Sequence, residues 1–356
     1  TSSESPSFMV ASSFYENAIQ TLRTVPRAYR TTQKVDERIE ELRAKLQEFG
    51  ELARSEMQKM QTSSVDLKHI AQNARQLVTG KPAHQALFAF ANLHPGANVK
   101  ELRANALEGM RKYPFQWLFA GTMLSRDGRV IAKRPSVVLG DALNEDDEIA
   151  VNAHMVQNYG ILIGVLVLGD ILPALEVLLL EHRFREFDFI ALARNSPIVP
   201  KDRAGLFGKA LFAGYEGDYV TALHLLIPQI EHLVRVHLKQ AGAITTNLDK
   251  YGIQNENGMS TLLKLPEASK VFDEDLLFEL NSLFCDPFGP NLRNELAHGL
   301  LDEVQCKSAF AIYAWWLALR VTVNTWWNSA KPTAKQKDPN DELASNTQLV
   351  EAKGEA

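Results

Sequence analysis

The chain has 356 residues, of which 46% are hydrophobic and 23% charged, and its net charge is -5 at pH 7. These proportions are ordinary for a soluble globular protein, and the net charge gives no overall sign of a chain that binds polyanions. The length exceeds what one compact core usually holds, so we expect two domains and tails. The two cysteines, Cys285 and Cys306, form no CxxC pair. They favour a reducing compartment and argue against a zinc or disulfide framework.

Two features bear on the location of the protein. Residues 1–5 lack the basic and then apolar order of a signal peptide. The one strongly apolar run, residues 161–169, is too short to span a bilayer, and Asp170 follows it. We therefore expect a buried helix at this run, a cytoplasmic protein and no membrane partner.

The N-terminal part of the chain is expected to be mainly helical. Residues 1–35 are polar with one short apolar-periodic piece and are predicted to form a partly ordered arm. A domain over residues 36–195 follows. Its first helix, residues 36–61, has apolar residues every three or four positions over only a few turns, which favours a packed helix over a coiled-coil arm. Further helices are predicted at 66–78, 85–92, 99–113 and 144–187.

One β-hairpin interrupts these helices, near residues 117–133. Asp127-Gly128 stands between two runs of strand-forming residues, which is the pattern of a type I′ turn. The acidic segment 144–148 is expected to cap the next helix. The prolines and polar residues at 195–200 mark the predicted boundary between the two domains.

The second domain, residues 200–330, is predicted to be a helical bundle. Its longest helix covers 218–240, where Pro228 is expected to produce a kink. A polar loop over 242–260 is followed by helices near 260–265, 273–284 and 303–327. The tryptophan pairs in the last helix are predicted to be core or interface anchors rather than platforms for bases. Residues 331–356, rich in charged residues, are expected to be a disordered tail.

Several common site motifs are absent from the sequence. It lacks the phosphate-binding P-loop, the dinucleotide-binding glycine pattern, the zinc-protease HExxH and the GxSxG nucleophile turn. His232 and His237 are five residues apart on a predicted helix, so their side chains cannot easily share a metal. We expect no cofactor and no metal ion.

The most informative segment is residues 291–302, where Arg293, Asn294 and His298 follow a turn rich in proline and glycine. Arginine is a permanent cation whose planar donors suit phosphate oxygens, and histidine can transfer protons near neutral pH. With Asn291 as N-cap and Gly299 as helix end, Arg293 falls in the first helical turn, where the helix dipole disfavours a cation. A local rule broken without structural gain is a hint of function.

A purely structural role competes with this interpretation. Arg293 could pair with Glu295 or Asp302, and His298 could be a buried histidine at a helix end. The spacing R-x4-H is common by chance, so the pattern alone favours the structural role. Residues 201–320 contain 11 basic and 15 acidic residues, a net charge of -4, which argues against extended coating of nucleic acid but allows a local cationic site.

The heptad 293–299, RNELAHG, resembles the RNxxxHG signature of a domain of unknown function in the HEPN superfamily (higher eukaryotes and prokaryotes nucleotide-binding). Segments 212–219, 225–231 and 286–291 and residue Arg235 are also similar to that branch. The resemblance covers about residues 206–327, with weak support from 125–130. It implies an all-α bundle, often paired so that two motifs face each other across a dimer.

The resemblance also implies a metal-independent endoribonuclease, in which a ribose 2′-OH attacks the adjacent phosphorus and leaves a 2′,3′-cyclic phosphate. In this reaction Arg293 would bind the phosphate and stabilise the transition state, and His298 would act as general acid and base. Asn294 would orient the substrate or the imidazole. Glu231 and Arg235, four residues apart on the preceding helix, are expected to form an ion pair that supports the motif.

Two functions remain open at this stage. The first is a HEPN-type nuclease, in a toxin or antiphage defence context, with RNA as substrate, a homodimer formed through the C-terminal helical domain, and a regulatory protein bound by the N-terminal domain. The second is a non-catalytic dimerisation or interaction module that keeps the HEPN fold. The intact Arg293, Asn294 and His298 set favours the first, and the acidic balance favours the second. In both cases we expect an all-α protein, with a C-terminal HEPN-like bundle and an N-terminal mainly helical domain carrying one hairpin.

Overall fold

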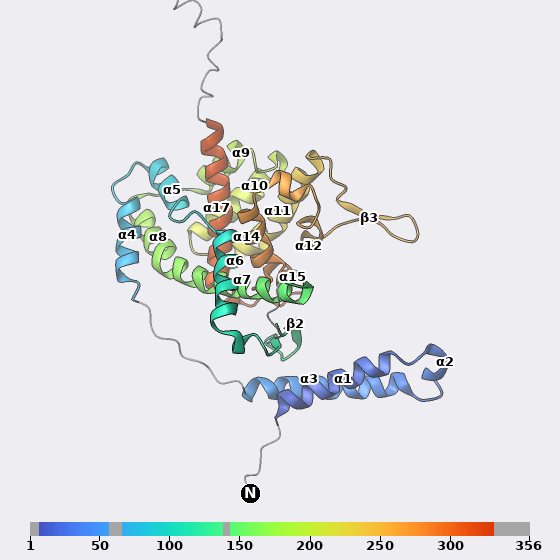
Figure 1. Ribbon diagram of the computed structural model, residues 1–356. Coiled ribbons are helices and arrows are strands. Elements are labelled where there is room, and N and C mark those ends of the chain that lie inside the picture. Colours follow the sequence, from blue (N-terminus) through green and yellow to red (C-terminus); the bar gives the residue numbers. More distant parts are fainter. Residues whose placement is uncertain (1–6, 57–65, 138–142, 331–356) are drawn as a thin grey trace, which may run out of the picture.

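The computed structural model describes residues 7–56, 66–137 and 143–330. Within these ranges the chain is mainly α-helical and has two small antiparallel hairpins, so the predicted fold class is confirmed. Figure 1 shows the main helical body with a separate pair of helices beneath it. The predicted disordered tail, residues 331–356, lies outside the described residues.

The pair beneath the main body is built from α1 (Phe8–Arg23) and α3 (Val35–Glu56), joined through the short α2 (Arg27–Arg30). Ile19, Ile39 and Leu42 form a small buried cluster between α1 and α3. The predicted helix from residue 36 is therefore confirmed up to Glu56. The expected arm is more regular than its polar composition indicates, because α1 is held by packing against α3.

The helices of the next region follow the predictions closely. The acidic segment caps α7 as predicted, since Asn144 and Asp147 form a reciprocal capping box. One turn of π-helix (η2) lies just before Pro173, which has no N–H to donate to the preceding turn. The predicted long helix ends at Glu181 rather than near 187, because His182 is extended. The bounds are α4 (Lys68–Val78), α5 (Ala83–Ala91), α6 (Val99–Lys112), η1 (Pro114–Gln116), α7 (Glu145–Leu166), η2 (Val167–Ile171), α8 (Leu172–Glu181) and α9 (Glu186–Asn195).

The segment Glu145–Glu181 is, among the described helices, the one long and apolar enough to cross a membrane by length and composition. The nine-residue run in the sequence is therefore part of a longer apolar helix. Half of its most apolar 18-residue window is buried inside the fold. Ile163 and Val167 are buried, whereas Ile161 and Leu168 are exposed. A core helix passes the same test, so the cytoplasmic location stays a prediction.

The predicted first hairpin is present, with strands β1 (Gly121–Leu124) and β2 (Val130–Arg134), but the predicted type I′ turn is wrong. Type I′ requires positive φ at both central residues. Here only Gly128 is left-handed (φ +81), the Gly128 N–H donates to the Ser125 carbonyl, and the register is irregular beside Leu124. Asp127 has no positive φ, and its carboxylate accepts hydrogen bonds from the side chains of Ser125 and Arg129 in the turn.

The C-terminal region departs from prediction at two places. The polar loop contains a second hairpin, β3 (Thr246–Leu248) with β4 (Gln254–Glu256), whose exposed strands carry no apolar alternation. The predicted helix 303–327 is two helices, because Ser308 accepts a hydrogen bond from the Ala311 N–H and caps the second. The helix α11 continues through Pro228. The helices are η3 (Lys201–Arg203), α10 (Ala204–Tyr215), α11 (Tyr219–Gln240), α12 (Met259–Leu262), α13 (Ala268–Val271), α14 (Glu274–Phe284), α15 (Leu292–Ala297), α16 (Glu303–Cys306) and α17 (Ala309–Ala330).

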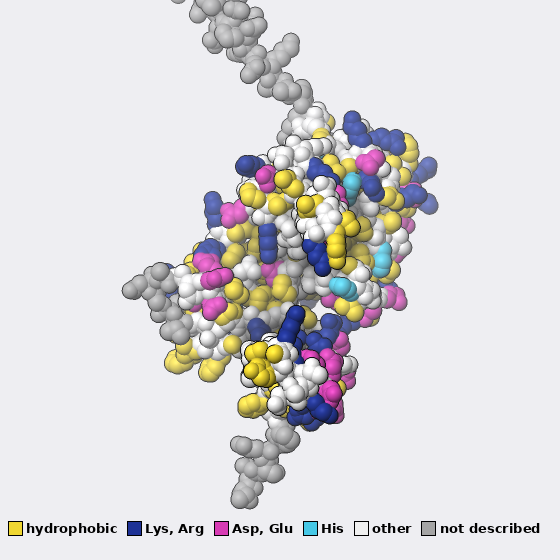
Figure 2. Space-filling model, turned by 90° about the vertical axis from the view of Figure 1, so that its right-hand side faces the viewer, with side chains coloured by type: hydrophobic (Ala, Val, Ile, Leu, Met, Phe, Trp, Pro, Cys, Tyr) yellow, Lys and Arg dark blue, Asp and Glu magenta, His cyan; other side chains and the backbone are white. Residues whose placement is uncertain are grey.

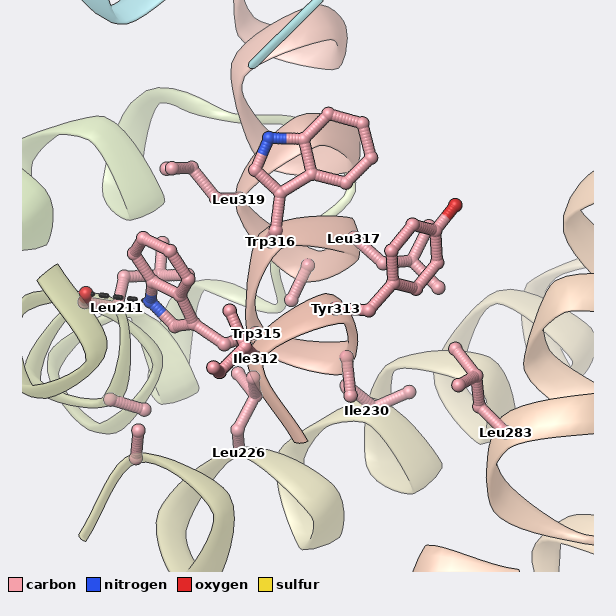
Figure 3. Close-up of a cluster of buried hydrophobic side chains, with 14 of the residues drawn as sticks. Leu211, Leu226, Ile230, Leu283, Ile312, Tyr313, Trp315, Trp316, Leu317 and Leu319 are labelled. Carbon is pink, nitrogen blue, oxygen red and sulfur yellow. Dashed lines mark hydrogen bonds between the residues drawn. The ribbon is translucent and has the colours of Figure 1, made fainter. Parts of the chain in front are cut away.

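The hydrophobic core is centred on α17, which crosses the main body in Figure 1. Trp315 and Trp316 are fully buried, as predicted. The indole N–H of Trp315 donates to the Leu211 carbonyl (Figure 3). That of Trp316 donates to the Phe90 carbonyl. Phe90 precedes the predicted domain boundary and Leu211 follows it. One cluster of buried residues extends from α4 to α17, so the hydrophobic core does not divide at residues 195–200.

Candidate functional site

The turn before the motif is rigidly built, and it sets the direction of α15. The buried Asp286 accepts hydrogen bonds from the Phe288 N–H at 2.9 Å and from the Asn152 side chain at 3.0 Å. At Gly289 the chain passes so close to α14 that a Cβ would lie 2.1 Å from the Ser282 carbonyl oxygen. Only glycine fits there without a shift of the backbone. The predicted proline- and glycine-bounded turn is thus a fixed support for the motif.

The ends of α15 differ in how well the sequence predicted them. Asn291 occupies the predicted N-cap position, but it is left-handed (φ +47) and its side chain makes no capping hydrogen bond. Asparagine tolerates this conformation better than most residues. At the other end Gly299 is left-handed (φ +67), with the Leu300 N–H bonded to the Glu295 carbonyl at 2.8 Å. The predicted helix end is confirmed, and His298 is the C-cap residue.

Arg293 pairs with a residue on a distant helix. Its Nε donates to Oε2 of Glu231, on α11, at 2.8 Å. The two alternatives considered from sequence, pairing with Glu295 or with Asp302, are therefore wrong. The Arg293 side chain remains 36% exposed, whereas that of Glu231 is 15% exposed. The contact gives Arg293 a structural partner that the local sequence could not reveal.

Glu231 bridges two guanidinium groups. The predicted pair with Arg235 is confirmed, with Nη2 of Arg235 2.9 Å from Oε1 of Glu231. Arg235 also donates to the Asn257 carbonyl at 2.7 Å and lies 2.9 Å from the Glu256 carboxylate. Burial raises the pKa of Glu231, but the hydrogen bonds from Arg293 and Arg235 outweigh it and hold the pKa below its ordinary value. Glu231 is therefore ionised at neutral pH.

The terminal nitrogens of Arg293 are the available part of this network. Within the described residues, Glu231 occupies Nε and nothing binds Nη1 or Nη2. Lys239 completes the network by pairing with Glu256 at 2.8 Å. Three cations and two carboxylates leave the group with one net positive charge. A partly exposed guanidinium, oriented through its Nε, can still bind an anion with its other two nitrogens.

Asn294 is half-buried within α15, and His298 is exposed at the end of that helix. The two residues are linked through the backbone, where the His298 N–H donates to the Asn294 carbonyl at 3.1 Å. The His298 side chain is exposed, which overturns the alternative of a buried histidine at a helix end. No residue in the described ranges forms a hydrogen bond or ion pair with either side chain. Both groups are thus free to meet a ligand.

The β1–β2 turn brings further charged residues to the motif segment, which sequence reasoning did not place. Arg126 pairs with Asp302, and both side chains are more than half exposed. Arg129 pairs with Asp127, and its pKa is raised by that contact and further by the charge of Glu295 on α15. The stretch 125–130 belonged to the weak extension of the family resemblance. About 170 residues separate it from the motif, so only the fold could show their proximity.

Two other chemistries have no support at this site. Burial raises the pKa of the Cys285 thiol to about 12, although the Arg293 charge opposes that change. The thiol beside the motif is therefore protonated and a poor nucleophile. In the described part of the chain there is no group of three or more His, Cys, Asp or Glu side chains arranged to hold a metal ion.

Comparison with known proteins finds no match to this chain among protein-family models, curated proteins or solved structures. The roles of the site residues therefore rest on their geometry and on the motif itself.

Proposed function

We propose that this protein is a metal-independent endoribonuclease of HEPN type, with Arg293, Asn294 and His298 as its catalytic residues. The observation that carries the proposal is the way Arg293 is held. Glu231 binds the guanidinium through Nε, so the two terminal nitrogens have no partner among the described residues. The exposed side chain of His298 has none there either. This arrangement supports the binding of a phosphodiester by Arg293, with the exposed His298 at the C-terminal end of the same short helix.

In the proposed reaction the ribose 2′-OH loses its proton as its oxygen attacks phosphorus, and the 5′-oxygen leaves with a proton. The products are a 2′,3′-cyclic phosphate and a 5′-hydroxyl end. Arg293 stabilises the charge that develops on the phosphorane, and proton transfer by His298 typically contributes about 10²–10⁴-fold. The step needs a general base and a general acid, and one His298 can be only one of them. We therefore propose a homodimer in which His298 of the second copy is the other group.

The surroundings of the motif support a short RNA segment as substrate. Arg126 and Arg129 are engaged in exposed ion pairs, which are worth only about 0–1 kcal/mol each, so a phosphate can displace their carboxylates. Figure 2 shows one face of the molecule, where basic and acidic side chains are interspersed. Mixed charge of this kind does not favour long, continuous coating of nucleic acid.

A second function, a non-catalytic helical module for dimerisation, is favoured by one observation. The Arg293–Glu231 ion pair joins α15 to α11, which is what a structural arginine would do. In that case replacing Arg293 would lower stability, and the wild-type protein would cleave no RNA.

The deciding experiment incubates the purified protein with single-stranded RNA in EDTA, beside Arg293→Ala and His298→Ala. We expect cleavage by the wild type, a loss of at least about 100-fold in each variant, and cyclic phosphate ends detected by mass spectrometry. His224→Ala is the matched control, because His224 is an exposed histidine whose one hydrogen bond among the described residues is to the Val220 carbonyl of its own helix. Equal cleavage by all variants would remove the assignment of these residues, and a folded wild-type protein without cleavage would favour the structural module.

A further inference from the structure

Residues 111–134 form a basic stretch in an acidic chain. They contain six basic residues and one acid, Asp127, which gives a net charge of +5, whereas the whole chain carries -5. The stretch covers the end of α6, η1 and the β1–β2 hairpin. Concentrated positive charge of this kind is typical of surfaces that bind polyanions. The six basic residues are Arg111, Lys112, Arg126, Arg129, Lys133 and Arg134.

Aromatic residues alternate along the first part of this stretch, at positions 113, 115, 117 and 119. Trp117 is 4% exposed and packs in a buried cluster with residues of α6 and α7. The other three are exposed, Tyr113 to 50%, Phe115 to 78% and Phe119 to 72%. Exposed apolar groups that gather in one place mark binding surfaces. The aromatic segment, residues 111–119, is therefore anchored by Trp117 and presents three rings to solvent.

Arg134, on β2, fixes the backbone of the aromatic segment. Its guanidinium carbon lies 5.3 Å from the centre of the Trp117 ring. Its Nη2 donates to the carbonyls of Gln116 at 3.3 Å and Phe119 at 3.1 Å. Because the hairpin holds the segment in this way, the exposed rings need little ordering when a ligand binds.

The start of the aromatic segment supplies cations for a ligand. Arg111 and Lys112 are exposed, and neither forms an ion pair within the described residues. Nζ of Lys112 lies 5.5 Å from the centre of the Tyr113 ring. Proteins bind single-stranded nucleic acid by stacking its bases on exposed rings, while nearby cations meet its phosphates. The aromatic segment presents both kinds of group.

The β1–β2 hairpin connects the aromatic segment to the motif. It lies at the lower end of the main body in Figure 1. Its first strand begins two residues after Phe119, and its turn carries Arg126, which pairs with Asp302 of the motif segment. The chain from Phe119 to Arg126 spans about 20 Å when extended. A single RNA strand at the motif can therefore follow the hairpin to the exposed rings.

We propose that the aromatic segment binds single-stranded RNA, with bases stacked on Phe115 and Phe119 and phosphates at Arg111 and Lys112. This inference extends the nuclease function and rests on it, because the bound strand is the one cleaved at the motif. Every base has a flat face, so binding requires unpaired bases and not a particular sequence. A membrane surface fits less well, because the basic residues continue along the hairpin to the motif.

Fluorescence anisotropy of a labelled single-stranded RNA tests the proposal on the full chain. The His298→Ala protein in EDTA is the parent, so that cleavage does not remove the probe. We expect the parent to bind this strand at least about tenfold more tightly than the matching duplex. Adding Phe115→Ala and Phe119→Ala should weaken single-strand binding at least about tenfold. Both rings are exposed, so the fold of this aromatic variant is expected to persist.

Phe187→Ala is the matched control, because Phe187 on α9 is also 72% exposed and lies outside the basic stretch. It should bind RNA like the parent. Equal affinity of the aromatic variant and this control overturns the proposal, and so does a parent that binds no RNA. Sedimentation with vesicles of phosphatidylcholine and phosphatidylserine tests the membrane alternative. Vesicle binding that is lost in the aromatic variant, with no binding of RNA, would replace the proposal by a membrane surface.

Cleavage assays with intact His298 separate this proposal from the nuclease proposal. We expect cleavage with and without the two phenylalanine substitutions, and a KM at least about tenfold higher with them. Equal KM values would contradict the RNA surface and leave the nuclease assignment intact. Single-strand binding that depends on the rings, in a protein that cleaves no RNA, would support the surface and contradict the nuclease.

Discussion

Glu231 decides what Arg293 can do, because its single carboxylate joins two guanidinium groups. Arg293 is oriented through Nε, and Arg235 is anchored independently by the Asn257 carbonyl. The side chain of Arg293 therefore has a fixed partner outside its own six-residue helix. Its direction is fixed by α11, and this contact converts an exposed cation into one with a defined orientation.

The substitution Glu231→Gln tests whether orientation of Arg293 matters to the reaction. We expect kcat for RNA cleavage to fall by about 10–100-fold, because misplacement of a catalytic group is costly. KM should stay level or fall, since the site gains positive charge. Steady-state kinetics measure the changes in kcat and in KM separately. Glu295→Gln, an acid on α15 outside the network, serves as control, and a parallel fall in both variants would contradict the positioning role.

Acidification should weaken the same network. The folded-state pKa of Glu231 lies below its ordinary value of 4.5, so its contribution to stability is complete above that value and is lost as the pH falls through the folded pKa. We expect the stability difference between wild type and Glu231→Gln, about 1–3 kcal/mol at pH 7, to shrink below about pH 4.5. Urea denaturation at several pH values measures it, and a constant difference would contradict the expectation.

At the scale of elements, periodicity and caps predict most of the helices. The helices α4, α5 and α6 lie within two residues of their predicted ends, since apolar spacing and Gly or Pro signals are local properties. The second hairpin could not be predicted, because all but one of its strand residues are exposed and the strands carry no apolar alternation. The break before α17 depends on one serine hydroxyl. In the site, the Glu231–Arg235 pair could be predicted from its local spacing. The Glu231–Arg293 contact could not, because 62 residues separate its partners.

Gly128 has two roles: its left-handed backbone forms the β1–β2 turn, and it packs against Gly50 on α3. Glycine substitutions can separate these two roles. Gly128 has φ +81 and its Cβ would lie 2.3 Å from the Gly50 backbone, whereas Gly217 has φ +82 and no neighbour within 4 Å. We expect Gly217→Ala to cost about 1 kcal/mol for backbone strain alone. Gly128→Ala adds the clash and should release α3 from the turn. Hydrogen exchange on α1 and α3 detects the release, and equal exchange in the two variants would contradict the contact.

At the scale of the whole molecule, the core unites regions that the sequence separates. Trp316 on α17 donates to the Phe90 carbonyl of α5, and Ser196 donates to the Thr322 carbonyl at 2.9 Å. Composition and linkers indicate a boundary at 195–200, because prolines interrupt helices there. Helical periodicity shows which face of a helix is apolar but does not identify the helix that covers it. The motif bundle is therefore stabilised in part by residues that precede it.

This arrangement makes a prediction about fragments. A chain of residues 200–330 lacks Phe90, Tyr159 and Phe189, which are all at most 1% exposed in the core. Loss of a large buried side chain costs about 3–5 kcal/mol, and total stability is about 5–15 kcal/mol. We therefore expect residues 200–330 alone to show no cooperative unfolding by circular dichroism. Residues 66–330 keep this core and lack only α1–α3, so they should unfold cooperatively. A sharp thermal transition in the shorter fragment would mean that the motif bundle is an independent domain.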